Sequence, residues 1–450
     1  MRIDVVKADV LKNIKPGKEE EERVKKFANK LLLVSRSISG MDCVLVGSLG
    51  KFTWLRGDHD VDLFIMFPLE TSREELEKRG LELGKKIASE MRGKWRIKYA
   101  EHPYVHAFIG GFDVDIVPCY RIANGESIKS AVDRSPLHLE YVLKTLKDGQ
   151  QDEVRLLKQF CKGISVYGSD ARHLGFSGYI CELLVMKYGS FESVLASAAN
   201  WRTPQVVSFG AVKGNFKQPL IIMDPTDASR NAAANVSGEN LVKFIASARS
   251  FIRQSDQKYF YKQEPKRLST PEIKLLQKRG TIFITLSLKK PDIIDDVLYP
   301  QLRKTLRRLE TIFMQNGFSV MRCYETINEN EIFLIFEIET ASLPNIKKMV
   351  GPPLSSHTHT QEFLTKYKSP DYGPYVEDDR WVIEKKREST TPENLLKALL
   401  HQDLTAIGIP DNIAKPMKKS VIVKDVWKLA KTKKAISAFL REKYFSSLRV

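Results

Sequence analysis

The chain of 450 residues lacks the features that would place it in a membrane or outside the cell. No apolar run reaches the roughly 18 to 20 residues that a membrane helix needs, and the N-terminal segment MRIDVVKADVLKNIKPGKEEEE has no signal-peptide core. The five cysteines are scattered and include no C-x-x-C pair, so zinc or redox chemistry is not expected from them. We therefore expect a cytoplasmic protein without a membrane partner, whose cysteines are reduced and mostly buried.

Fixed-period repeats and low-complexity tracts are also absent, and acidic residues are in deficit. Seventy-two lysines and arginines against 55 aspartates and glutamates give a formal net charge of +17. Such an excess indicates a polyanionic partner, with nucleic acid first, because cations that neutralise phosphates gain free energy from counterion release. From Lys415 to Val450, eleven lysines and arginines face two acidic residues, a net charge of 11 - 2 = +9. This C-terminal segment is predicted to contact a nucleic-acid backbone.

The length and the pattern of the chain predict a multidomain α+β protein. Residues 1–139 alternate helical and strand patterns, which indicates a domain with a mixed sheet. Residues 140–262 show helical periodicity almost throughout. Residues 263–345 follow a β-α-β-β order, which suggests a ferredoxin-like sheet. Residues 346–450 contain the strand-like segment DRWVIEKKRE and then the basic, helical C-terminus.

The most informative segment is VGSLGKFTWLRGDHDVDLFIMFP, in which a strand begins at Asp60. On a strand, Asp60 and Asp62 point to the same face, while the intervening apolar residues point to the core. Two carboxylates this close repel each other unless a cation lies between them, and their hard oxygen ligands suit Mg²⁺. A D-x-D pair alone is more often a solvated strand face. The predicted metal site therefore depends on what accompanies the pair.

Two further features accompany the D-x-D pair. The Gly47-Ser48 turn precedes the strand, so its backbone N–H groups, the Ser48 hydroxyl and the charge of Lys51 are expected to hold triphosphate oxygens. A second strand-like segment, FDVDIVPCY, places Asp113 and Asp115 on one face, and spacing alone does not choose between them. The third carboxylate of a two-metal phosphoryl-transfer site is expected from this pair. The ordered combination favours catalysis over a solvated strand and a plain turn.

The combination of a Gly-Ser turn, a D-x-D pair and a later aspartate resembles the DNA polymerase β-like nucleotidyltransferases. The resemblance extends to the class I, archaeal-type CCA-adding enzymes over most of the first 260 residues. The segments that carry it are YAEHPYVHAFIGGFDVDIVPCY, IKSAVDRSPLH, EVRLLKQFCKGISVYGSDARHLGFSGYICELL and MDPTDASRNAAANVS. The resemblance implies a nucleotidyltransferase head, a helical nucleotide-binding neck, a ferredoxin-like body and a basic α/β tail that binds RNA.

The resemblance also implies roles for individual residues. The metal ligands and catalytic carboxylates would be Asp60, Asp62 and Asp115, which resolves the choice that spacing left open. The nucleotide contacts would be Ser48, Lys51, His138, Lys158 and Tyr167 for the phosphates and sugar, and Arg230 for the edge of the base. The family more often has Arg in place of Lys51 and Glu in place of Asp60. Without the resemblance, Lys158 would be interpreted as a solvated helix face, Tyr167 as core and His138 as a surface histidine.

The function implied by the resemblance is template-independent addition and repair of the CCA end of tRNA. The substrates would be CTP, ATP and the acceptor arm and 3′ end of tRNA, two Mg²⁺ ions would be the cofactors, and the protein would be a homodimer. Two alternatives stay open from the sequence. One is a poly(A) polymerase-like enzyme that uses ATP alone, and the other is a catalytically inactive RNA-binding protein on the same scaffold.

Overall fold

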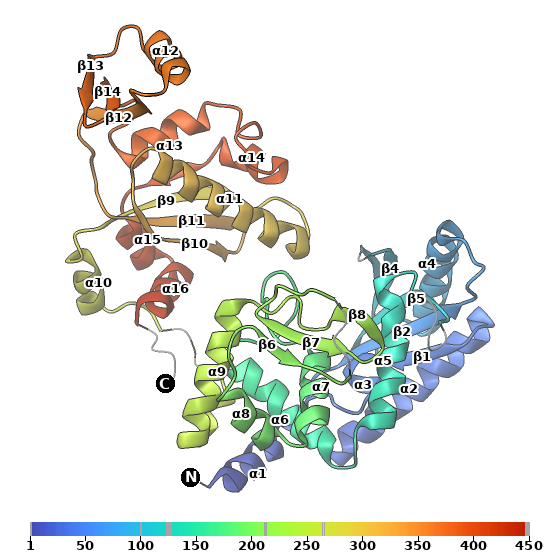
Figure 1. Ribbon diagram of the computed structural model, residues 1–450. Coiled ribbons are helices and arrows are strands. Elements are labelled where there is room, and N and C mark those ends of the chain that lie inside the picture. Colours follow the sequence, from blue (N-terminus) through green and yellow to red (C-terminus); the bar gives the residue numbers. More distant parts are fainter. Residues whose placement is uncertain are drawn as a thin grey trace. The chain divides into compact units, whose positions relative to one another are not determined.

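The computed structural model of the chain divides into two compact units (Figure 1). Their described residues run from 2 to 262 and from 264 to 445. The structure describes residues 2–99, 101–122, 128–210, 214–262, 264 and 266–445. Both units combine helices with sheets, which confirms the predicted multidomain α+β fold. Among the described helices, none is both long and apolar enough to cross a bilayer.

The N-terminal part of the first unit is built on a mixed five-stranded sheet. Its strands have the order β1-β2-β5-β4-β3, in which β2 and β5 are parallel and the other pairs are antiparallel. The predicted mixed sheet is thereby confirmed. The elements are α1 (Ile3–Ile14), α2 (Lys18–Ser39), β1 (Cys43–Val46), α3 (Gly47–Gly50), β2 (Asp60–Phe67), α4 (Arg73–Glu90), β3 (Lys94–Tyr99), β4 (Pro103–Ile109), β5 (Phe112–Tyr120) and a 3₁₀ turn (Ala131–Asp133).

Alternation along the central strands gives this sheet one apolar face. Val61, Leu63 and Ile65 of β2 are buried in a core that also includes residues of α2 and α4. Burying each of these side chains contributes on the order of 1.5–3 kcal/mol. Helix α4 comes close to the sheet at Gly84, where an added methyl group would overlap with Val105. The opposite face carries the aspartates of β2 at the start of the strand and, further along, a smaller apolar cluster that includes Val46, Phe64 and Cys119.

The rest of the first unit is mainly helical, as predicted, but it also contains a three-stranded sheet that the sequence pattern did not predict. Figure 1 shows this part in colours from turquoise at α5 through green to yellow-green at α9. Phe160 lies at the centre of its aromatic core, and Val6 and Val10 of α1 pack into the same core. The elements are α5 (Arg134–Thr145), α6 (Gln150–Gly163), α7 (Gly178–Tyr188), α8 (Phe191–Ala198), β6 (Gln205–Val207), β7 (Leu220–Asp224), β8 (Asp227–Asn231), α9 (Gly238–Arg253) and a 3₁₀ turn (Gln257–Tyr259).

The second unit contains the predicted β-α-β-β order in an antiparallel sheet, β10-β11-β9-β15. Helix α11 connects β9 to β10, and β11 lies between them. The elements are α10 (Thr270–Gln277), β9 (Ile282–Lys289), α11 (Asp295–Gln315), β10 (Val320–Asn328), β11 (Glu331–Ile338), β12 (Ile346–Pro353), α12 (His357–Lys366), β13 (Tyr372–Glu377), β14 (Arg380–Lys386), α13 (Pro392–Leu400), α14 (Asp411–Met417), β15 (Val421–Val423), α15 (Val426–Thr432) and α16 (Lys434–Phe445).

The C-terminal elements of the second unit pack on this sheet. Strand β15 pairs with β9, and Ile436 and Leu440 of α16 share a core with Phe333 of β11. Strands β12, β14 and β13 form a separate small sheet. The predicted domain boundaries at residues 139, 262 and 345 stay predictions. The pairing of β15 with β9 shows that the predicted region 346–450 shares a sheet with the predicted region 263–345.

Candidate active site

Four aspartates lie on one face of two neighbouring parallel strands. β2 and β5 are paired with Asp60 beside Asp113 and Asp62 beside Asp115. Residues that are paired in this way point to the same side of a sheet. All four carboxylates are therefore on the face opposite to Val61, which is buried in the core. The pattern of the sequence predicted this division of faces for β2.

Burial and neighbouring charges disfavour the ionised forms of Asp60 and Asp62. Burial, followed by the charges of Asp115 and Asp60, raises the pKa of Asp62 to about 6, although Lys51 acts in the opposite direction. Burial and three neighbouring aspartates likewise raise the pKa of Asp60. A divalent cation would supply the positive charge that this arrangement needs, and carboxylate oxygens are the ligands that Mg²⁺ prefers. The chemistry of the donor set therefore fits magnesium.

The third carboxylate faces a histidine in the structure. His106 Nδ1 lies 2.6 Å from Asp115 Oδ1, and Lys98 Nζ lies 3.9 Å from the same oxygen. Within the described ranges, no three His, Cys, Asp or Glu side chains converge closely enough to hold a metal ion. Asp115 is nevertheless the partner of the half-buried Asp62, while the side chain of Asp113 is 52% exposed. The register favours Asp115 over Asp113 as the third carboxylate.

The Gly-Ser turn packs directly against one of these carboxylates. Gly47 has a φ of +66°, and a Cβ atom at this position would overlap with the Asp62 carboxylate. Glycine alone meets both requirements, since it adopts positive φ without strain and leaves room for the carboxylate. The turn brings Ser48 into the wall of a cavity that Asp62 also lines. A short local connection thus places the turn and the metal-binding candidates side by side.

Both predicted phosphate-binding lysines contact a buried glutamate that sequence reasoning missed. Lys51 Nζ lies 2.8 Å from Glu182 Oε2, and Lys158 Nζ lies 3.4 Å from Glu182 Oε1. Thr53 Oγ1 donates a hydrogen bond of 2.7 Å to Glu182 Oε1. Burial would raise the pKa of Glu182, but the two lysines outweigh it and lower the pKa. Two cations and one anion leave a net charge of +1, which suits a phosphate group.

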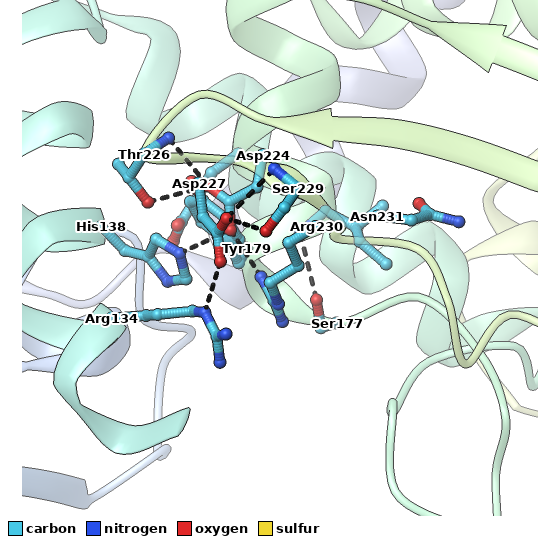
Figure 2. A network of polar contacts seen from close by, with 12 residues as sticks. Arg134, His138, Ser177, Tyr179, Asp224, Thr226, Asp227, Ser229, Arg230 and Asn231 are labelled. Atoms are coloured by element: carbon cyan, nitrogen blue, oxygen red, sulfur yellow. Dashed lines mark hydrogen bonds and ion pairs between the residues drawn. The ribbon is translucent and has the colours of Figure 1, made fainter. Parts of the chain in front are cut away.

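A second buried carboxylate, Asp224 at the end of β7, contacts two more of the predicted residues, His138 and Arg230 (Figure 2). His138 Nε2 lies 2.9 Å from Asp224 Oδ2, and the Arg230 guanidinium donates to the same oxygen at 2.6 Å. Tyr179 donates its hydroxyl proton to Asp224 Oδ1 at 3.0 Å, and its ring stacks on His138 at 3.9 Å. Thr226 donates to the same oxygen through both its backbone N–H and its hydroxyl. Asp224 therefore anchors two predicted nucleotide contacts.

Burial and hydrogen bonds shift the pKa values of Asp224 and His138. Burial alone would raise the pKa of Asp224, but hydrogen bonds from His138, Thr226 and Arg230 hold it well below its usual range. Burial lowers the pKa of His138 in spite of the carboxylate. Since an ionised Asp224 can only accept hydrogen bonds, the His138 Nε2 that faces it carries a proton. Lys51 lies 4.9 Å from the centre of the Tyr179 ring, which joins this network to the lysine cluster.

One cavity of about 790 Å³ collects these groups. Its wall includes all the predicted site residues except Arg230: Ser48, Lys51, Asp60, Asp62, Asp115, His138, Lys158 and Tyr167. Arg230 is connected to the cavity through Asp224. Lys158 and Tyr167 also lie close to Gly178, where a Cβ atom would come within 3.3 Å of the Lys158 nitrogen and the Tyr167 hydroxyl oxygen. Lys158 is buried rather than solvated, which contradicts its interpretation as an ordinary helix surface.

Sequence reasoning missed three residues that organise the site: His106, Glu182 and Asp224. Asp224 carried a local signal, because it begins the turn DPTD between two short strands. Glu182 occurs in an otherwise apolar helical segment, where a buried charge implies a partner. His106 alternates with apolar residues on β4 and had no distinguishing neighbour. The role of each residue depends on contacts with residues that are distant in the sequence and meet only in the folded chain.

A mixed sheet with paired aspartates, a Gly-Ser turn against them and buried lysines across one cavity define a nucleotidyltransferase. Comparison with protein families agrees with this class. Residues 22–138 match the nucleotidyltransferase domain, residues 152–261 match the second domain of tRNA nucleotidyltransferase, and residues 279–425 match the C-terminal domain of CCA-adding enzymes. The three matches follow one another along most of the chain.

Similarity to curated proteins defines the family. The chain is 37% identical to the CCA-adding enzyme of Methanoregula boonei over 86% of this chain and 84% of that protein. It is 38% identical to the CCA-adding enzyme of Methanothermobacter thermautotrophicus, over 87% of each. With the CCA-adding enzyme of Methanosarcina mazei the identity is 36%, over 88% of this chain and 89% of the relative. The chain belongs to the family of CCA-adding enzymes, as its resemblance predicted.

Proposed function

We propose that this enzyme adds C, C and A to the 3′ end of tRNA from CTP and ATP, releases pyrophosphate, and repairs incomplete ends in the same way. The observation that carries the proposal is one cavity whose wall contains the aspartates, the Lys51–Glu182–Lys158 cluster and His138, which is bound to Asp224. The basic second unit would bind the acceptor arm through phosphate contacts. We also propose a cytoplasmic homodimer, and sedimentation of the purified chain tests the dimer.

Asp60 and Asp62 would hold two Mg²⁺ ions, and Asp115 would join them at one ion after turning away from His106. Bound magnesium makes the 3′ hydroxyl of the RNA easier to ionise and stabilises negative charge on the phosphates. Ser48, Lys51 and Lys158 would bind the triphosphate, and His138 and Tyr167 would orient its phosphates and sugar. Arg230, held by Asp224, would donate to the Watson–Crick edge of the base. The base would thus be chosen without a nucleic-acid template.

The defining test uses tRNA that lacks its CCA end, with Mg²⁺ and with CTP, ATP or both. We expect two residues to be added from CTP alone and a third only when ATP is also present. Long tails from ATP alone would instead indicate a poly(A) polymerase. Binding of tRNA without any incorporation would indicate an inactive RNA-binding protein.

Replacing Gly47 with alanine is expected to lower the rate of CMP incorporation by about 10²-fold, since a displacement of about 1 Å at a reacting centre costs that much. The added methyl group overlaps with Asp62 and forces the carboxylate to move. Single-turnover incorporation measures the effect. Gly57→Ala is the matched control, because Gly57 also has a positive φ but has open space around it. If both variants lose the same fraction of the incorporation rate, backbone strain alone would explain the effect and the contact with Asp62 would not.

Asp224→Asn is expected to reduce the preference for CTP over UTP by about 10- to 100-fold. A hydrogen bond to a charged group contributes about 1.5–3 kcal/mol, and each 1.4 kcal/mol is a factor of ten. The measurement is the ratio of kcat/KM values for the two nucleotides. Asp227→Asn is the control, since Asp227 lies in the same hairpin but pairs with Arg134, at 3.1 Å. An unchanged ratio in Asp224→Asn would refute the role of this anchor in base selection.

A further inference from the structure

The carboxylate face of the sheet continues into basic and aromatic residues that the proposed mechanism does not use. β4 pairs with β5 so that His106 lies beside Asp115 and Phe108 beside Asp113. β3 pairs with β4 so that Arg96 lies beside His106. Directly paired residues of antiparallel strands point to the same face. The acidic centre of the sheet is therefore bordered, on the same face, by a basic edge strand.

Two of these cations reach the catalytic cavity. Arg96 and Lys98 are in its wall together with Asp113 and Asp115, and Lys98 Nζ lies 3.9 Å from Asp115 Oδ1. Arg96 is exposed, and Phe108, which lies on β4 beside Lys94, is 54% exposed. Cations along a groove, with an aromatic ring available for stacking, are the usual features of a site for single-stranded nucleic acid.

The chemistry of the reaction assigns the two sides of the carboxylates to different substrates. In phosphoryl transfer the attacking and leaving oxygens lie roughly in line, on opposite sides of the phosphorus. Lys51 and Lys158, which would bind the triphosphate and its leaving pyrophosphate, contact Glu182 of α7. The attacking 3′ hydroxyl must then come from the other side of the carboxylates. Asp115 lies on β5, and the strands next to β5 on that side of the sheet are β4 and then β3.

We propose that Arg96, Lys98 and Phe108 form a platform for the 3′-terminal nucleotides of the RNA strand. Arg96 and Lys98 bind its phosphodiester groups, and Phe108 stacks on an unpaired base. Alternate residues of a strand are about 6.8 Å apart, so both cations can contact one stretch of backbone. The platform holds the strand so that its terminal hydroxyl reaches Asp115. This inference rests on the proposed function, because it assumes that the triphosphate is bound at the lysine cluster.

The test is the double variant Arg96→Gln/Lys98→Gln in the full chain. With tRNA lacking CCA, CTP and Mg²⁺, we expect the KM for tRNA to rise about tenfold or more, while the KM for CTP changes less than about twofold. The logarithmic slope of tRNA affinity against salt concentration should weaken by about 0.7 for each phosphate that the variant no longer neutralises. The matched control is Lys78→Gln/Lys86→Gln, which removes two exposed charges from α4, the helix that packs on the opposite face.

An increase in the KM for CTP with an unchanged KM for tRNA would overturn the platform and assign these cations to the triphosphate. Equal effects in the control variant would also overturn it, as a general effect of charge. Binding separates this inference from the proposed function. Wild-type protein should bind tRNA ending in CC more tightly than tRNA trimmed to its last paired nucleotide, and the double variant should lose this difference. If the wild type binds but never extends the RNA, the proposed function fails while the binding difference still tests the platform.

Discussion

Asp62→Asn is expected to lower the rate of nucleotide incorporation by about 10³-fold or more, with little change in folding. Asparagine has the size of aspartate but lacks the charge that a metal ligand at this position requires. A metal ion contributes several kcal/mol of charge stabilisation to phosphoryl transfer, and each 1.4 kcal/mol corresponds to a factor of ten. Asp62 is half-buried beside Asp115 and Asp60, and its partial burial and these two neighbours raise its pKa and so disfavour its charge. Removing that charge should therefore not destabilise the protein.

Single-turnover incorporation of CMP, together with thermal unfolding, measures both parts of this expectation. Asp113→Asn is the matched control, because it removes the same charge one strand away from Asp60 at a half-exposed position. We expect a loss of at most about tenfold there, since a partly solvated charge pair is worth about 1 kcal/mol. Near wild-type activity in Asp62→Asn would exclude this residue as a metal ligand. A larger loss in Asp113→Asn than in Asp115→Asn would reverse the choice of the third carboxylate.

Glu182→Gln is expected to lower the free energy of unfolding of the first unit by about 3–5 kcal/mol, the usual effect of removing one partner from a buried ion pair. Glu182 contacts both Lys51 and Lys158, and both lysines are buried. Its loss leaves two cations close together with no neutralising charge. A bound triphosphate would supply that charge. CTP with Mg²⁺ should therefore raise the Tm of the variant by more than it raises the Tm of the wild type.

Denaturant unfolding and thermal shifts with and without CTP give the two quantities. Glu192→Gln is the control, because Glu192 is exposed on the neighbouring helix α8. We expect it to change the unfolding free energy by less than about 0.5 kcal/mol. A stable Glu182→Gln variant would show that the lysines do not need this carboxylate. A destabilised variant whose Tm responds less to CTP would show that the triphosphate binds elsewhere.

The sequence was sufficient wherever a local period decides the outcome. Because side chains alternate along a strand, Asp60 and Asp62 lie on one face and Val61 lies in the core, and this division does not depend on distant parts of the sequence. The Gly47-Ser48 turn lies near Asp62 because β1 and β2 pair as neighbours in the chain, with Val46 beside Asp62. The three-stranded sheet that carries Asp224 was not predicted, because its strands are only three to five residues long and have little periodicity.

By itself, the sequence determined the class of fold, the family and the cluster of acidic and phosphate-binding candidates, because these depend on short patterns. The tertiary structure decided which charges meet. Lys51 is separated from Glu182 by 131 positions, and His138 from Asp224 by 86. The periodicity of a helix or strand cannot predict such pairs, because they form only when separate helices and strands pack around one cavity. The register of β2 against β5, which sets Asp115 beside Asp62, is likewise a property of the folded sheet.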